Sequence, residues 1–335
     1  MTARLPQLDG LRGVAIGLVF GVHCFGVPHG GQIGVDIFFM LSGFLITSIL
    51  LEEHVATGRI SFASFYRRRA ARLLPALFVF LAIYLLIATA KGVDGLEPAA
   101  IGTFYVSNLV EAFGGNAMMV RAGIPHLWSL AEEEQFYLLW PLLLPIFARR
   151  THPVKLLLGV LALLIMYRFV LALGGAGHSR LYNGPDTHMD GLVLGATIAF
   201  LLQRRPRFRI SPIWIAVGLP ILVVALDVRD PSQGWDALGL PITEAAIATL
   251  LLGALTAPAL ARGLSLAPLR FLGRISYSLY LWHYTLVWAW GSPRHAWAAA
   301  AASLAVACIS TVWIEEPLRR RMRTGNRVVP APAIA

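Results

Sequence analysis

The chain has 335 residues, of which 57% are hydrophobic and 14% are charged, and its formal net charge at pH 7 is +10. A soluble domain carries about 25% charged residues, so this composition excludes an ordinary soluble protein and predicts one that lies almost wholly in or near a bilayer. The basic residues form short clusters between apolar runs, which indicates membrane topology rather than nucleic-acid binding.

Ten apolar runs predict ten membrane spans of an all-α bundle, with boundaries soft by several residues. The runs are 13–28, 33–51, 73–90, 136–148, 154–172, 189–202, 212–226, 241–260, 275–291 and 297–314. If the N-terminus is cytoplasmic, 22 of the 28 Lys and Arg residues fall on inner segments, 5 on outer segments and one, Arg168, inside a span. This bias predicts that both termini are cytoplasmic. A single domain is expected over residues 1–323, followed by a short disordered cytoplasmic tail, 324–335.

The first two spans contain ionisable residues where a bilayer makes them costly, and such residues mark a functional site by default. Arg12 and His23 are eleven positions apart, about 16 Å along a helix, and Asp36 follows in the second run. The short connection predicts antiparallel neighbours, so His23 and Asp36 should lie at similar depth. A carboxylate can orient an imidazole and leave its other nitrogen as a general base. The alternative is a buried pair that only joins two helices.

The basic run from Phe65 to Pro75 precedes the third span on the inner side. Arg69 and Arg72 are three positions apart and share a helix face, where two guanidinium groups can bind phosphates bidentately. Anchoring of the inner membrane face is the alternative interpretation, and it explains Arg67 and Arg68 well.

Three further groups carry weaker signals. Glu132, Glu133 and Glu134 precede the fourth span on the outer side, where acidic residues also favour a helix N-terminus. His283 falls near the middle of the ninth span. It is either a site residue or a histidine that forms a hydrogen bond between packed helices. Glu315 and Glu316 end the last span, and Glu316 could simply pair with nearby arginines. No Cys/His cluster with metal-ligand spacing occurs, so no metal is expected.

Taken together, these segments resemble the acyltransferase-3 family of membrane-bound O-acyltransferases, which includes the O-antigen acetylases. The resemblance runs from Leu8 to about Arg320 and is highly specific because six blocks occur in the family's order. They read LDGLRGVAIGLVFGVH, GVDIFFMLSGFLI, RRRAARLLPAL, HLWSLAEEEQFYLLWPLL, LGRISYSLYLWH and EEPLRR.

The resemblance implies a role for each matching residue. His23 would be the catalytic histidine, as general base or acyl-accepting residue, with Asp36 in support. Arg69 and Arg72 match an Arg-x-x-Arg implicated in binding acyl-coenzyme A, with acetyl-CoA the expected donor. The remaining matches are Arg12 on the cytoplasmic path to the site, Glu133 with Glu134 beside it, and Glu315. This sequence departs from the family at two positions. Glu132 occupies a position where the family usually has an apolar residue, and His188 stands where the family often has an Arg before Asp190.

The resulting hypothesis is an enzyme of the bacterial cytoplasmic membrane that moves an acyl group from cytoplasmic acyl-CoA to a hydroxyl. The expected acceptor is a glycan, a glycosylated lipid or a small molecule, and no nucleic acid is involved. The main alternative is a multi-span transporter of a small solute, which buried ionisable residues also fit. A transporter more often has internal repeats, and this sequence has no clear one. A structural or sensing membrane protein is a second alternative.

Overall fold

The computed structural model describes residues 5–115, 117–228, 232–291 and 293–318, and within these ranges every regular element is a helix. The long helices are α1 (Pro6–Phe25), α2 (Ile33–Thr57), α3 (Phe62–Ala90), α7 (Leu127–Ala148), α8 (Pro153–Leu173), α11 (Asp190–Arg204), α12 (Pro212–Ala225), α13 (Leu240–Thr256), α15 (Ala267–Trp290) and α16 (Ala296–Ser310). The short ones are α4 (Leu96–Thr103), α5 (Ser107–Gly114), α6 (Ala117–Arg121), α9 (His178–Asn183), α10 (Pro185–His188), α14 (Pro258–Leu264), η1 (Trp235–Gly239), η2 (Pro293–His295) and η3 (Thr311–Glu315). The all-α prediction is confirmed for this part of the chain, and the predicted tail, 324–335, lies outside it.

Each of the ten predicted spans overlaps one long helix, and six helices are long and apolar enough to cross a membrane. They are α1, α2, α3, α8, η1 continued by α13, and α16 continued to Leu318. Helices α11 and α12 have 15 and 14 residues, fewer than the ~20 of an ideal span. Helices α7 and α15 are long enough, but they hold too many charged or polar residues to be counted with the six. The number of ten spans and the cytoplasmic termini therefore stay predictions.

Two helices begin earlier than their apolar runs. Helix α3 begins at Phe62, so the predicted phosphate-binding run is part of the helix itself. Helix α7 begins at Leu127, so Glu132, Glu133 and Glu134 lie inside it rather than ahead of it. The alternative interpretation of these glutamates as acidic residues of a helix N-terminus is wrong, because α7 begins more than one turn ahead of Glu132 and has no acidic residue in its first turn.

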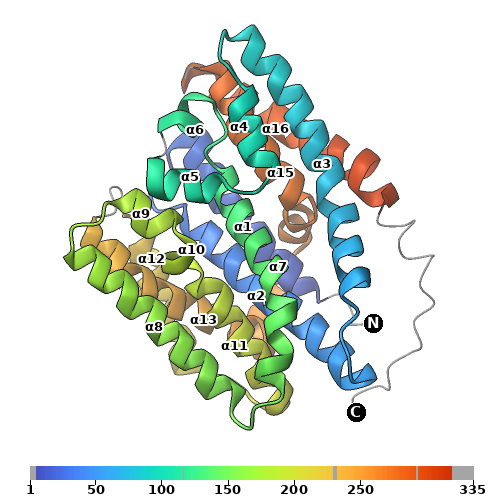
Figure 1. The fold of residues 1–335 in the computed structure, drawn as a ribbon, viewed down its shortest axis with the longest axis vertical. Coiled ribbons are helices and arrows are strands. Elements are labelled where there is room, and N and C mark those ends of the chain that lie inside the picture. Colours follow the sequence, from blue (N-terminus) through green and yellow to red (C-terminus); the bar gives the residue numbers. More distant parts are fainter. Residues whose placement is uncertain (1–4, 116, 229–231, 292, 319–335) are drawn as a thin grey trace.

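The helices at the periphery expose apolar side chains. Figure 1 shows α3 and α8 at opposite edges of the bundle. Leu163 and Val170 of α8 are 60% and 57% exposed, and Val223 of α12 is 67% exposed. Contiguous apolar faces of this kind are rare on soluble monomers and are suited to contact with lipid.

A close backbone contact joins two helices from opposite ends of the chain, α1 and α15. A Cβ added to Gly13 would lie 2.0 Å from the carbonyl oxygen of Leu269, and one added to Gly273 would lie 1.7 Å from that of Asp9. Only glycine allows such an approach. The side chains of α1 that face α15 are consequently held against it.

The stretch between α3 and α7 folds back onto the bundle through α4, α5 and α6. Tyr105 sits between α4 and α5 with φ of 53°, a left-handed conformation that is uncommon for a residue with a side chain. The Gln135 side-chain amide of α7 donates a 2.9 Å hydrogen bond to the Tyr105 carbonyl and fixes this turn. The turn brings the Tyr105 ring to the cavity described next.

Candidate active site

A polar cavity lies between α1, α2, α3, α7 and α15, in two adjoining lobes. Both lobes are lined by Arg12, Ser42, Leu130, Glu133 and Tyr277. The first lobe adds Arg69, Arg72, Leu73, Tyr105, Glu134 and Tyr137, and the second adds Val35, Phe38, Phe39, Ser129, Ser276 and Tyr280. Five residues singled out from the sequence, Arg12, Arg69, Arg72, Glu133 and Glu134, therefore lie around one cavity.

Arg69 is held in place by aromatic and acidic side chains of α7. Its Nε and Nη2 donate hydrogen bonds of 3.2 and 3.0 Å to one carboxylate oxygen of Glu134. Its Nη2 lies 3.9 Å from Glu133, and its guanidinium carbon lies 3.5 Å from the centre of the Tyr137 ring. The Arg69 guanidinium is thus rigidly oriented, and a cation over an aromatic face is further stabilised.

The cavity has an excess of positive charge. Three guanidinium groups, of Arg12, Arg69 and Arg72, line it with two carboxylates, of Glu133 and Glu134. The three guanidinium groups exceed the two carboxylates by one charge, and an anionic ligand would meet this net positive charge. Clustered guanidinium groups of this kind suit phosphate groups.

Arg12 and His23 each contact a residue of α15. The Arg12 Nη2 donates a 3.0 Å hydrogen bond to Ser276 Oγ, and His23 Nδ1 lies 2.8 Å from His283 Nε2. The later residue of α1 contacts the later residue of α15, so the two helices run parallel. Eleven residues on α1 and seven on α15 are each close to whole numbers of helical turns, which is why each pair projects from one face.

The hydrogen bonds of His283 determine which nitrogen of His23 is free. His283 Nδ1 lies 3.0 Å from the Leu279 carbonyl oxygen and 2.8 Å from that of Tyr280. Carbonyl oxygens only accept, so Nδ1 carries the proton and Nε2 of neutral His283 is an acceptor. His23 must then donate from Nδ1, which leaves the lone pair of neutral His23 on Nε2. A free imidazole lone pair is what a general base or a nucleophile requires.

The two histidines lie beside the far lobe of the cavity. Tyr280, which lines that lobe, has its ring 5.6 Å from the His283 ring. The Tyr280 hydroxyl donates to the His126 carbonyl at 2.9 Å, and the His126 ring lies 5.4 Å from the His283 ring. His283 is fully buried and His23 is half-buried, so His23 is the more accessible of the pair.

The predicted pair of His23 with Asp36 is not formed. Asp36 Oδ1 instead lies 3.0 Å from His188 Nε2, while His23 faces His283 across the α1–α15 contact. The reason is the direction of each helix face: α2 packs most extensively on α11, whereas α1 packs most extensively on α15. Similar depth in neighbouring helices was therefore not sufficient to bring the two side chains together.

The three consecutive glutamates point in different directions. Glu133 accepts hydrogen bonds from Ser42 Oγ at 2.9 Å and from the Tyr137 hydroxyl at 3.3 Å, and Glu134 binds Arg69. Glu132 is completely buried on another face of α7, and neither carboxylate oxygen has a hydrogen-bond partner among the described residues. Successive residues of a helix are rotated by about 100°, which separates Glu132 from the cavity that its neighbours line.

Glu315 is buried at the end of α16, in the single turn η3. It accepts a hydrogen bond from Ser278 Oγ of α15, two residues from the Ser276 that binds Arg12. Glu315 does not line either lobe of the cavity as the structure describes it. Its contact instead supports the helix that carries Ser276 and His283.

Several residues that complete the site were missed in the sequence. Ser42, Tyr137 and Tyr280 have ordinary side chains for a membrane helix, and no spacing marks them. Ser276 is different, because it precedes His283 by seven residues, two helical turns. That spacing, set against Arg12 and His23, is a signal that could have located it.

The chain belongs to the acyltransferase-3 family, whose acyltransferase domain matches residues 5–315. The resemblance seen in the six sequence blocks is therefore confirmed. No solved structure matches the chain.

Two relatives show how the similarity is distributed. A peptidoglycan O-acetyltransferase, OatA, of Listeria monocytogenes is 34% identical over 94% of this chain and 56% of its own length. An O-acetyltransferase OatA of Staphylococcus aureus is 33% identical over 84% of this chain and 50% of its own length. The chain thus spans about half the length of these curated relatives.

Proposed function

We propose that this protein is a membrane O-acetyltransferase that moves an acetyl group from cytoplasmic acetyl-CoA to a hydroxyl of an envelope glycan. The family supports acyl transfer, and the name of the Listeria relative supports a glycan acceptor, with peptidoglycan the first to test. The observation that carries the proposal is the 2.8 Å contact of His23 Nδ1 with His283 Nε2, which leaves the lone pair of neutral His23 on Nε2.

The reaction is one proton transfer coupled to acyl transfer. His23 Nε2 takes the proton of the acceptor hydroxyl as its oxygen attacks the thioester carbonyl. The carbon–sulfur bond breaks, coenzyme A leaves as the thiolate, and the proton on His23 neutralises it. An acetyl group carried transiently on Nε2 is the alternative order of the same bond changes.

The donor would enter by the lobe that Arg12, Arg69 and Arg72 line. Its phosphates would meet the excess guanidinium charge, and its thioester arm would extend along the second lobe toward Tyr280. Ten spans with cytoplasmic termini would put the start of α3, which carries Arg69 and Arg72, toward the cytoplasm. Reporter fusions after Arg150 and Arg209 should then read cytoplasmic, and an external reading at Arg209 would overturn this topology.

Activity is tested with purified protein in detergent or vesicles, labelled acetyl-CoA and peptidoglycan fragments, with acetyl transfer followed by mass spectrometry. His23→Gln should abolish transfer, whereas His29→Gln, the same change in the loop before α2, should leave it near the parent rate. Equal activity of the two variants would refute the role of His23. Uptake of a solute without any acetylated product would instead support the transporter.

The donor site has its own matched test. Arg72→Ala should raise the apparent KM for acetyl-CoA, because Arg72 lines the cavity. Arg67→Ala, an equal loss of charge five residues earlier on α3, should change it little. Equal, small effects would show that the basic run only anchors the inner face.

A further inference from the structure

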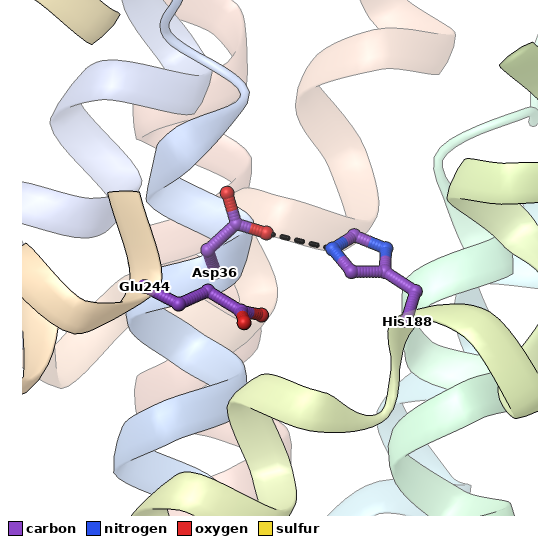
Figure 2. Close-up of side chains that lie close together, drawn as sticks. All are labelled: Asp36, His188 and Glu244. Atoms are coloured by element: carbon purple, nitrogen blue, oxygen red, sulfur yellow. Dashed lines mark hydrogen bonds and ion pairs between the residues drawn. The ribbon is translucent and has the colours of Figure 1, made fainter. Parts of the chain in front are cut away.

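A second polar cluster lies on the other side of α2 from the cavity, closed off from solvent. Asp36 of α2, His188 of α10 and Glu244 of α13 converge there (Figure 2), and each is at most 1% exposed. Each offers one ligand atom within 4.8 Å of the other two. In Figure 2 the Glu244 carboxylate points into the space between Asp36 and His188.

The hydrogen bonds of His188 leave one nitrogen facing a carboxylate. His188 Nδ1 lies 2.6 Å from the Tyr182 carbonyl oxygen, and a carbonyl only accepts, so Nδ1 carries a proton. In neutral His188 the lone pair is then on Nε2, which lies 3.0 Å from Asp36 Oδ1. Two acceptors face each other at that distance only when a positive charge, a proton or a metal ion, lies between or beside them.

Glu244 shows that one shared proton would not be enough. Both of its carboxylate oxygens, and Asp36 Oδ2, lack a hydrogen-bond donor among the residues that the structure describes, and a close polar neighbour of Glu244 is a second carboxyl, that of Asp190. Buried polar atoms without a partner cost a few kcal/mol each, so such atoms in a native site point to an absent ligand.

The wider cluster holds more carboxyls than cationic side chains. Four buried carboxylates interact electrostatically, those of Asp36, Asp190, Glu132 and Glu244. The only guanidinium facing them in the described chain belongs to Arg168, 2.7 Å from Asp190. With all four ionised and His188 also protonated, two negative charges would stay uncompensated in a buried site, where isolated charges are very costly, so either two further protons or a dication must be present.

We propose that Asp36, His188 and Glu244 bind one divalent cation that accepts mixed nitrogen and oxygen ligands, with Zn²⁺ the ion to test. A dication supplies the two missing charges at once. Small rotations of the side chains bring donors within 4.8 Å of one another onto one ion at ~2.0–2.2 Å. The His188 Nδ1–H bond to a backbone carbonyl is the outer contact that usually orients a metal-bound imidazole.

The ion would act on structure rather than on the acyl group. It would link α2, α10 and α13, next to the cavity wall formed by Val35 and Phe39. The Phe39 ring lies 5.4 Å from the His188 ring. The site would thereby set the position of α2, on which Ser42 also lies.

Metal content is the direct test, because it does not depend on acetyl transfer. Full-length protein purified in detergent and loaded with Zn²⁺ should retain about one equivalent per chain after gel filtration, as metal analysis would show. Glu244→Gln should lower the retained metal to a small fraction. Glu111→Gln, the same change at a buried carboxyl in α5, should retain the parent amount.

A thermal measurement covers the case in which Glu244→Gln fails to fold. Chelator-treated parent protein should gain melting temperature on titration with Zn²⁺, since an ion that binds the folded state stabilises it. Absence of retained metal together with an unchanged melting temperature would overturn the proposal, and would leave protons, one of them shared by Glu244 and Asp190, as the compensating charges. Equal metal in the parent and in Glu244→Gln would overturn it as well.

Discussion

The cavity and the closed cluster share two helices, α2 and α7, yet they differ in burial and in the balance of their charged groups. On α2, Ser42 faces the cavity and Asp36 faces the cluster. On α7, Glu133 faces the cavity and Glu132 is buried toward the cluster. The cavity has open space and more guanidinium groups than carboxylates, whereas the cluster is fully buried and has more carboxyls than cationic groups.

This difference shows that the role of an ionisable residue in a membrane helix depends on its surroundings and not on its residue type alone. A carboxylate beside a cavity is balanced by guanidinium groups and can exchange partners with a ligand. A carboxylate in the closed cluster cannot exchange partners in this way, and the free-energy cost of burying it must be compensated by groups or ions within the fold. Substitutions in the cavity should therefore change activity, and those in the cluster should change stability.

The largest effect is expected from removing the single guanidinium of the cluster. Arg168→Met should lower the free energy of unfolding by about 3–5 kcal/mol, because it leaves Asp190 buried without its partner. Arg12→Met, the same change at the cavity, should leave stability within about 1 kcal/mol of the parent and lower transfer activity instead. Thermal unfolding of both variants in detergent, with activity assays, checks this pair. Similar losses of stability would break the division between the two regions.

Neighbouring glutamates of α7 test the same division at a spacing of one residue. Glu133→Gln should lower kcat/KM by about 10- to 100-fold, since a charge-assisted hydrogen bond is worth about 1.5–3 kcal/mol and Glu133 orients both Ser42 and Arg69. Glu132→Gln should have near-parent activity, because it faces away from the cavity. Steady-state kinetics of the two variants measures this, and a reversed order would place the wrong glutamate in the site.

A smaller effect is expected at His283, which positions His23. His283→Ala should lower kcat by about tenfold, as His23 loses the acceptor that orients it. His283→Gln should recover part of this loss, because the amide oxygen can accept the same hydrogen bond. A purely structural role would make stability, rather than kcat, follow the substitution.

A pH-dependent effect is expected at Glu111 of α5, a buried carboxyl outside the spanning helices whose oxygen Oε1 has no partner in the described chain. Burial raises the pKa of Glu111 from 4.5 to about 9. The folded state thus keeps a proton that the unfolded state loses above pH 4.5, so stability should fall as the pH rises toward 9. The slope should approach about 1.4 kcal/mol per pH unit. Glu111→Gln should remove this slope in thermal unfolding between pH 6 and 8.

Sequence patterns located the helices and the charged residues that line the cavity, because both depend on local signals. The apolar runs overlap the ten long helices, and Arg12, Arg69, Arg72, Glu133 and Glu134 all line one cavity. The partners of His23 and Asp36 could not be predicted, since they depend on how each helix is rotated about its own axis. A rotation of 100° exchanges one neighbour for another without any change in hydropathy.

The bonds between α1 and α15 also have a consequence for biosynthesis. Arg12 binds a residue 264 positions later in the chain, and His23 binds one 260 positions later. The glycine contact that supports both bonds likewise needs Gly273. A nascent chain that has inserted only its first six or seven helices therefore holds most of the cavity but neither histidine pairing nor an anchored Arg12. The proposed reaction therefore requires that the ninth long helix, α15, has left the ribosome and packed against the first.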